Sequence, residues 1–151
     1  MTRIRTFSIV MSILVLVSLS IAQERTTERR AINLPRGTLS TAPFSDAVLV
    51  GNTLYLSGRG GIDLKTMKPP ADIKEEAKLM LDSFKEVLAQ ADMTFDNLLY
   101  VTIYCPDVGL YGTFNEVYRT YFKKDFPARA FIGSGPMLFG IHFEIQGIAV
   151  K

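Results

Sequence analysis

Arg129 is the residue whose chemistry most needs an explanation. It lies in the stretch FPARAFIG, from Phe126 to Gly133, where apolar neighbours predict a buried strand. No acidic residue occurs within this stretch. A guanidinium keeps its charge in a protein, and burying it without a partner is costly. Because a planar guanidinium suits two-pronged recognition of a carboxylate, Arg129 is a candidate ligand-binding residue, and the alternative is an ion pair across a subunit interface, for example with Glu144.

The stretch IHFEIQGIAV, residues 141–150, predicts the last strand because apolar and polar residues alternate along it. Phe143 and Ile145 then lie on one face of the sheet. We expect the opposite face to carry the candidate side chains of the last two strands: His142, Glu144, Gln146, Arg129 and Phe131. Such a face is too polar for a core and too apolar for plain solvent. Oligomerisation would cover it and would form sites between subunits.

The elements that must position these residues follow from the local patterns. AVLVGNTLYLSG predicts a hairpin, because Gly51 and Asn52 both tolerate a positive φ. A helix is predicted from Asp72 to Ala91, with Asp72 and Glu75 as a capping box. Its apolar positions recur at helical spacing and predict the buried face: Ala77, Met80, Leu81, Phe84, Val87, Leu88 and Ala91.

A second helix is predicted over TFNEVYRTYF, residues 113–122, with Thr113 and Glu116 as its capping box. Asn115 lies near this start, where it either caps the helix terminus or belongs to a site. Further strands are predicted at NLLYVTIYC and ARAFIG. The resulting order is β-β-α-β-α-β-β. Since each helix has one apolar stripe, we expect an α+β sandwich of one sheet with both helices on one face.

The N-terminal part differs in composition from the rest. Residues 1–22 have the order of segments typical of a secretory signal peptide: the basic Arg3 and Arg5, then an apolar run, then the small residues Ser20 and Ala22. The alternative is an uncleaved membrane anchor. A polar leader over residues 23–38 and one domain over residues 39–151 are expected to follow. Export is therefore the expected localisation, with no membrane contact after cleavage.

Charge and cysteine content exclude several classes of function. Beyond residue 22 the chain has 15 basic and 15 acidic residues, so no basic excess favours nucleic acid as a partner. Cys105, the only cysteine, lies in a strand-like run and is expected to be a buried apolar residue rather than a nucleophile. One histidine and one cysteine do not supply the ligands of a zinc site, so we expect no metal.

Several stretches together resemble the RidA/YjgF family of reactive intermediate deaminases. FPARAFIG followed by IHFEIQGIAV is similar to the C-terminal signature of that family. YLSGRGGID, VTIYCPDVGLYGTFNEVYRTYF and APFSDAV fit the same family in the same order, so the resemblance extends from Leu39 to Val150. It implies a chorismate-mutase-like fold and a homotrimer with a cleft at each subunit interface.

The resemblance also implies an activity, the hydrolysis of 2-imino or 2-enamino acids to 2-keto acids and ammonia without a cofactor. In the family, the arginine at the position of Arg129 binds the substrate carboxylate, and the acid at the position of Glu144 holds the attacking water. Ser57 and Asn115 match family positions near the cleft. Phe44 stands where many members have tyrosine, and Phe131 stands where the well-studied deaminases have cysteine, so the cleft walls differ.

Three functions follow as hypotheses. The first is an imine or enamine deaminase that uses Glu144 and Arg129 as catalytic residues, with Phe131, Phe44, Ser57 and Asn115 binding the substrate. The second is a module of the same fold that binds a small carboxylate without turnover. The third, an endoribonuclease, follows from an older name of the family, and the balanced charge counts against it.

Overall fold

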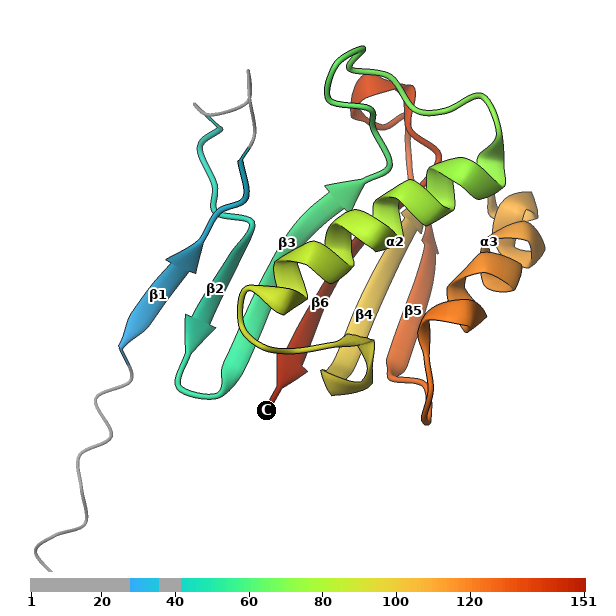
Figure 1. The fold of residues 1–151 in the computed structure, drawn as a ribbon. Helices are drawn as coiled ribbons and strands as arrows, with labels where there is room; N and C mark the ends of the chain where they lie inside the picture. The colour runs from blue at the N-terminus through green and yellow to red at the C-terminus, as the bar shows by residue number, and fades with distance from the viewer. Residues whose placement is uncertain (1–27, 36–41) are drawn as a thin grey trace, which may run out of the picture.

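The computed structural model describes residues 28–35 and 42–151. The predicted signal peptide, residues 1–22, lies outside these residues, and so do residues 23–27 and 36–38 of the predicted leader. One six-stranded sheet has the strand order β1-β2-β3-β6-β4-β5, and both described α-helices cover one face of it (Figure 1). The prediction of a mixed sheet with two helices on one face is therefore confirmed, with one strand more than expected. The strands are β1 Arg29–Ile32, β2 Ala47–Val50, β3 Thr53–Gly60, β4 Leu98–Cys105, β5 Ala128–Gly133 and β6 Glu144–Val150.

Strand β1 is the element that the sequence analysis missed. It lies within the segment read as a polar leader or loop, and it pairs antiparallel with β2. Only Ile32 among its four residues is buried, so the strand carries no apolar alternation. Main-chain pairing with β2 forms this strand, and such pairing leaves little trace in the types of the residues.

The β2–β3 hairpin has the turn that was predicted. Gly51 adopts a φ of 60°, which glycine reaches without steric cost. Val50 pairs with Thr53 across the turn. An ion pair between the partly buried Arg59 and the buried Asp46 holds the hairpin, and Arg59 Nε also donates a hydrogen bond to Ser83 Oγ of α2 at 2.7 Å. Arg59 is thus an arginine whose charge and hydrogen bonds are satisfied within the chain.

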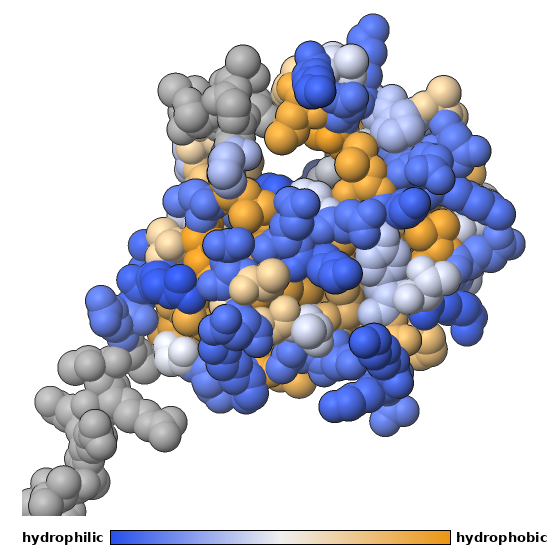
Figure 2. Space-filling model, in the orientation of Figure 1, coloured by the Kyte–Doolittle hydropathy of each residue, from blue (hydrophilic) through white to orange (hydrophobic). Residues whose placement is uncertain are grey.

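Helix α2, Ile73–Ala89, forms the main cover of the sheet. Asp72 caps it by accepting hydrogen bonds from the backbone N–H groups of Lys74 and Glu75, which confirms the Asp72 half of the predicted capping box. All seven apolar residues predicted for its buried face lie in the core. The space-filling view of this side is largely hydrophilic, because the opposite face of α2 carries charged residues (Figure 2).

Helix α3, Tyr111–Tyr118, begins two residues earlier than predicted and continues into a 3₁₀ turn, Arg119–Tyr121. The predicted capping box of Thr113 and Glu116 is wrong, because Thr113 lies inside the helix and no side chain caps its start. Glu116 instead forms an ion pair with Lys74 of α2 at 2.7 Å. Asn115 consequently lies within the helix, so its reading as a residue of the helix terminus is wrong as well.

The core lies between the sheet and the two helices. We call the covered side of the sheet the helix face and the other side the open face. Buried residues of β3, β4 and β6 alternate onto the helix face, including Leu54, Val101, Ile103 and Ile145. Cys105 is also buried there, as expected for an apolar residue. No helix in residues 28–35 and 42–151 is long and apolar enough to cross a membrane.

Candidate functional site

Arg129 lies among aromatic rings rather than beside an acid. Its guanidinium carbon is 4.7 Å from the centre of the Tyr118 ring, 5.5 Å from that of Tyr111 and 6.0 Å from that of Phe131. Such stacking favours a cation without neutralising it. Within the described part of the chain, Arg129 has no carboxylate partner, and its one hydrogen bond runs from Nη2 to the Tyr111 hydroxyl at 3.3 Å. In contrast to Arg59, it retains donors for a ligand.

The register of the parallel β4–β5 pair decides which way Arg129 points. Arg129 pairs with Val101 and Phe131 pairs with Ile103, and both β4 residues are buried on the helix face. Phe131 accordingly contacts the core, with its ring centre 5.6 Å from that of Phe114. The prediction that Arg129 and Phe131 share the open face with Glu144 is therefore wrong.

Asn115 joins the Arg129 group through Tyr111. Tyr111 opens α3, and Asn115 follows four residues later, so both side chains lie on one side of the helix. A hydrogen bond with the Asn115 side chain, together with the positive charge of Arg129, lowers the pKa of Tyr111. Arg129, Phe131 and Asn115, three of the predicted site residues, are thus brought together, and Tyr111 links them.

Glu144 opens β6 on the open face, opposite in direction to its buried neighbour Ile145. Its carboxylate lies over Gly58 of β3, where a side chain would overlap it. Burial raises the pKa of Glu144. Among the described residues, the carboxylate of Glu144 forms no hydrogen bond or ion pair. A half-buried carboxyl group with a raised pKa and a free oxygen is suited to accept a proton from water.

Ser57 and Phe44 lie on the side of Glu144. Ser57 immediately precedes Gly58, and its hydroxyl donates a hydrogen bond to the backbone carbonyl of Ser45 at 2.6 Å. That bond places the segment containing Phe44 beside β3. The Phe44 ring is 55% exposed. The Ser57 hydroxyl proton is already donated to the Ser45 carbonyl, so Ser57 could bind a ligand only by accepting a hydrogen bond or by van der Waals contact.

His142 does not lie on the open face, which corrects another expectation. It precedes β6, and its ring nitrogen Nδ1 is 2.7 Å from Oε2 of Glu76 in α2. Glu76 is fully buried and also accepts hydrogen bonds from the backbone N–H groups of His142 and Phe143. This carboxylate was missed by the sequence analysis, and it fixes the chain just before Glu144.

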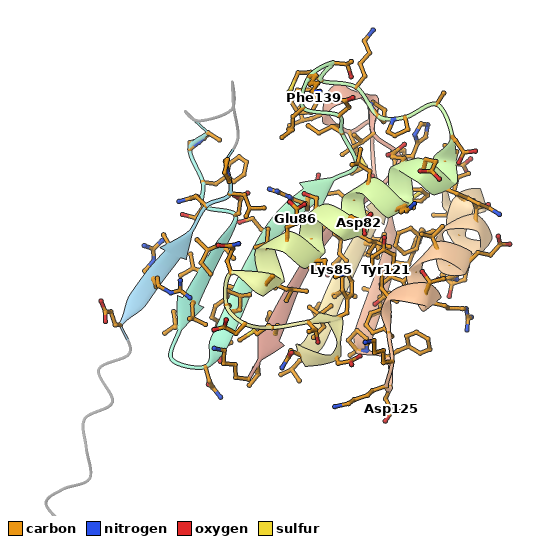
Figure 3. The ribbon with its side chains drawn as sticks, in the orientation of Figure 1. Asp82, Lys85, Glu86, Tyr121, Asp125 and Phe139 are labelled. Carbon is orange, nitrogen blue, oxygen red and sulfur yellow. The ribbon has the colours of Figure 1, made fainter. Side chains whose placement is uncertain are left out.

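The predicted site residues therefore form two groups on opposite faces of the sheet. Arg129, Phe131 and Asn115 lie at the edge strand β5 and helix α3. Glu144 lies in β6 and Ser57 in β3, with Phe44 in the segment before β2, and β4 separates these strands from β5. A surface groove of about 630 Å³ runs between α2 and α3, lined among others by Lys85 and Tyr121, and it contains none of the six residues (Figure 3). Within one chain, the fold therefore does not bring the two groups together.

Replacing Gly58 with alanine should test whether turnover depends on the position of the Glu144 carboxylate. The new methyl group would overlap Oε1 of Glu144, so the flexible carboxylate must move while the backbone stays. If Glu144 acts in catalysis, a shift of this kind should lower turnover by about 10²-fold. Steady-state kinetics measure the change, and an unchanged melting temperature would confirm that the fold is intact. A Gly112→Ala variant, where a methyl group meets nothing within 4 Å, is the control.

In residues 28–35 and 42–151, no three His, Cys, Asp or Glu side chains come close enough together to hold a metal ion.

Tyr111 and Gly58 were not predicted as residues of the site. Tyr111 could have been found from its spacing to Asn115 if the helix start had been placed correctly. Gly58 could not, because only the fold brings β6 against it.

Comparisons with known proteins give a consistent result. The sequence model of the family described as Endoribonuclease L-PSP matches residues 36–151. A mouse protein named 2-iminobutanoate/2-iminopropanoate deaminase is 36% identical over 124 residues, which cover 82% of this chain and 92% of the mouse protein. The YjgF gene product of Escherichia coli has a similar structure, with a TM-score of 0.74 and 26% identity over 81% of this chain and 98% of that one. Escherichia coli TdcF, solved with bound serine, gives a TM-score of 0.69 and 25% identity, with 81% and 94% of the two chains covered.

Proposed function

Because this chain belongs to the RidA/YjgF family, described as Endoribonuclease L-PSP, we propose that it hydrolyses 2-imino or 2-enamino acids to 2-keto acids and ammonia. One observation carries the proposal: Arg129 and Glu144 each retain an unused charge or proton-accepting group within the described residues. An unpaired guanidinium suits the carboxylate of such a substrate. A carboxyl group with a raised pKa suits activation of water.

The reaction needs few groups. Arg129 binds the substrate carboxylate and orients the imine carbon. Glu144 accepts a proton from a water molecule while the water oxygen bonds to that carbon and the C=N π electrons move to nitrogen. The same carboxyl group then returns that proton to the nitrogen, and afterwards it takes the hydroxyl proton of the resulting carbinolamine and passes it to the amine. The C–N bond breaks, a C=O bond forms and ammonia leaves, so no redox step or cofactor enters the balance.

The two groups of residues can meet only if different subunits supply them, so we propose an oligomer with shared sites. The resemblance to the RidA/YjgF family implies that this oligomer is a homotrimer. The open face offers a surface for assembly: Tyr55 of β3 pairs with Ile148 of β6, and Ile148 pairs with Tyr100 of β4. Tyr55 and Tyr100 are 50% and 42% exposed, which is unusual for neighbouring large rings unless another surface covers them. Arg129 of one subunit would then face Glu144 of the next.

Mixing two inactive variants tests the shared site. Arg129→Lys and Glu144→Gln proteins are unfolded together, refolded at equal concentration and assayed. If neighbouring subunits form each site, about a quarter of the sites in random closed assemblies contain both native residues and activity returns. If a single subunit held the whole site, no mixture would be active. Light scattering should give three times the protomer mass, and an active monomer would exclude the shared site.

The alternative function is a module that binds a small carboxylate without turnover. Phe44 and Phe131, which stand where the resemblance leads us to expect tyrosine and cysteine, favour it. An assay with imino acids generated in place, followed by the release of ammonia, separates the two functions. Binding of a 2-keto acid without any increase in the rate of imine hydrolysis would support the module. The name endoribonuclease is a family description, and the balanced charge beyond residue 22 gives RNA little to bind.

Export also belongs to the proposal. It is supported by the order of basic, apolar and small residues over positions 1–22. N-terminal sequencing of the protein from its native host would reveal a start near Gln23 if the segment is removed. An intact Met1 on protein from the cytosol would contradict export.

A further inference from the structure

We propose that Tyr111 is a second carboxylate-binding residue, which holds the Arg129 guanidinium in place and donates its own hydroxyl proton to the ligand. The inference rests on the proposed function, because it concerns the same ligand carboxylate. It adds a group that the sequence analysis did not include in the site.

The Tyr111 ring is held firmly while its hydroxyl stays accessible. The ring meets Phe131 edge to face, with 5.0 Å between the ring centres and an angle of 89°. Phe131 in turn packs against the fully buried Phe114. Tyr111 as a whole is 48% exposed. A rigid ring with an exposed hydroxyl group beside a cation loses little conformational entropy on binding a ligand.

The hydroxyl proton of Tyr111 is available for a ligand. Its oxygen accepts from Arg129 Nη2 at 3.3 Å. The side chain of Asn115 lowers the pKa of Tyr111, so its interaction favours the ionised phenol. A phenol has one proton to donate, and no hydrogen bond donated by the Tyr111 hydroxyl occurs among the described residues. A carboxylate bound to Arg129 would supply an acceptor for that proton.

The same surroundings predict how binding depends on pH. The groups that face the Tyr111 hydroxyl are Asn115 on α3, Arg129 on β5 and Arg119 just after α3, and together they lower its pKa. Tyr118, which is buried and lies against the same arginine, has its pKa raised to about 12. As pH rises, Tyr111 ionises first, loses the proton it would donate and pairs with Arg129. Carboxylate affinity should therefore fall on the alkaline side.

The experiment compares Tyr111→Phe with Tyr121→Phe. Both changes remove one hydroxyl and keep the ring, but Tyr121 donates its proton to Asp82 in the groove between the helices, outside the site (Figure 3). Calorimetry measures the binding of pyruvate, a non-reactive 2-keto acid, from neutral to alkaline pH. At neutral pH, Tyr111→Phe should bind about 10-fold to 100-fold more weakly than wild type, as expected for the loss of a hydrogen bond to a charged group. Tyr121→Phe should bind like wild type.

The pH profile separates a direct role from a structural one. Wild type should lose affinity as Tyr111 ionises, and the difference from Tyr111→Phe should shrink over the same range. A merely structural loss would be the same at every pH. Absorbance of the tyrosinate, taken as wild type minus Tyr111→Phe, gives the pKa of Tyr111 directly, and Arg129→Gln, which removes the positive charge, should raise it.

Each outcome has one meaning. Wild-type affinity with an unchanged profile in Tyr111→Phe, while the wild-type protein hydrolyses imines, overturns the role of Tyr111 and leaves the proposed function intact. Absence of both pyruvate binding and imine hydrolysis in wild type overturns the proposed function, and the ligand role of Tyr111 falls with it. A Tyr111 absorbance titration that Arg129→Gln leaves unchanged overturns the coupling between the two side chains.

Discussion

Replacing Arg129 with lysine should weaken the binding of a small carboxylate by about 2–5 kcal/mol, the range found when one partner of a buried charged pair is truncated. Lysine keeps the positive charge but loses the planar two-pronged geometry. It also stacks less well on the Tyr118 and Tyr111 rings that hold the guanidinium. Titration of the variant with pyruvate measures the loss of affinity.

A control variant with the same arginine-to-lysine change outside the site shows whether the loss of affinity is specific to Arg129. Arg29 is exposed on the edge strand β1, away from both groups of site residues, so Arg29→Lys should bind as wild type does. The fold of the Arg129→Lys protein should survive, because Arg129 is not part of the apolar core. Wild-type affinity in Arg129→Lys would exclude its carboxylate role.

Replacing Glu144 with glutamine should lower turnover by about 10²–10⁴-fold, the contribution typical of a positioned general base. Glutamine preserves the shape of the side chain over Gly58 but cannot accept the proton of water at neutral pH. Affinity for a 2-keto acid should change far less than turnover, because Arg129 still binds the carboxylate. Steady-state kinetics of imine hydrolysis, with separate binding measurements, test the prediction.

The pH dependence of the wild-type enzyme provides an independent check. Glu144 must be ionised to act as a base, so activity should fall as pH decreases through its pKa. Since burial raises that pKa, the loss should occur at higher pH than for an ordinary glutamate. Glu116→Gln, which alters an exposed acid paired with Lys74, should retain the wild-type rate and profile. A wild-type rate in Glu144→Gln would exclude Glu144 as the base and favour the binding module.

Local patterns predicted most of the elements, and the exceptions have identifiable causes. The Gly51–Asn52 turn, the Asp72 cap and the apolar face of α2 depend on residues close together in the chain. Strand β1 was missed because it exists through pairing with β2. The start of α3 was misplaced because Thr113 and Glu116 have the spacing of a capping box, while the observed start has no side-chain cap.

The sequence by itself determined which chemical groups are available. An arginine within an apolar strand, a glutamate in an alternating strand and an asparagine in an amphipathic segment could all be named from residue type and spacing. The types of these residues also limit the possible roles, because a guanidinium binds anions and a half-buried carboxylate accepts protons. Neither inference required knowledge of which way a strand faces.

Only the tertiary structure decided where these groups point. In β5, alternation separates Arg129 and Phe131 from Ala128, Ala130 and Ile132, and neither set is clearly the apolar one. Pairing with β4 settles the question, because side chains of paired residues lie on the same face and Val101 and Ile103 are buried under the helices. Alternation within a strand fixes which residues share a face, but pairing between distant strands fixes which face it is. For that reason the sequence named Arg129 and Glu144, and only the fold placed them on opposite sides of one sheet.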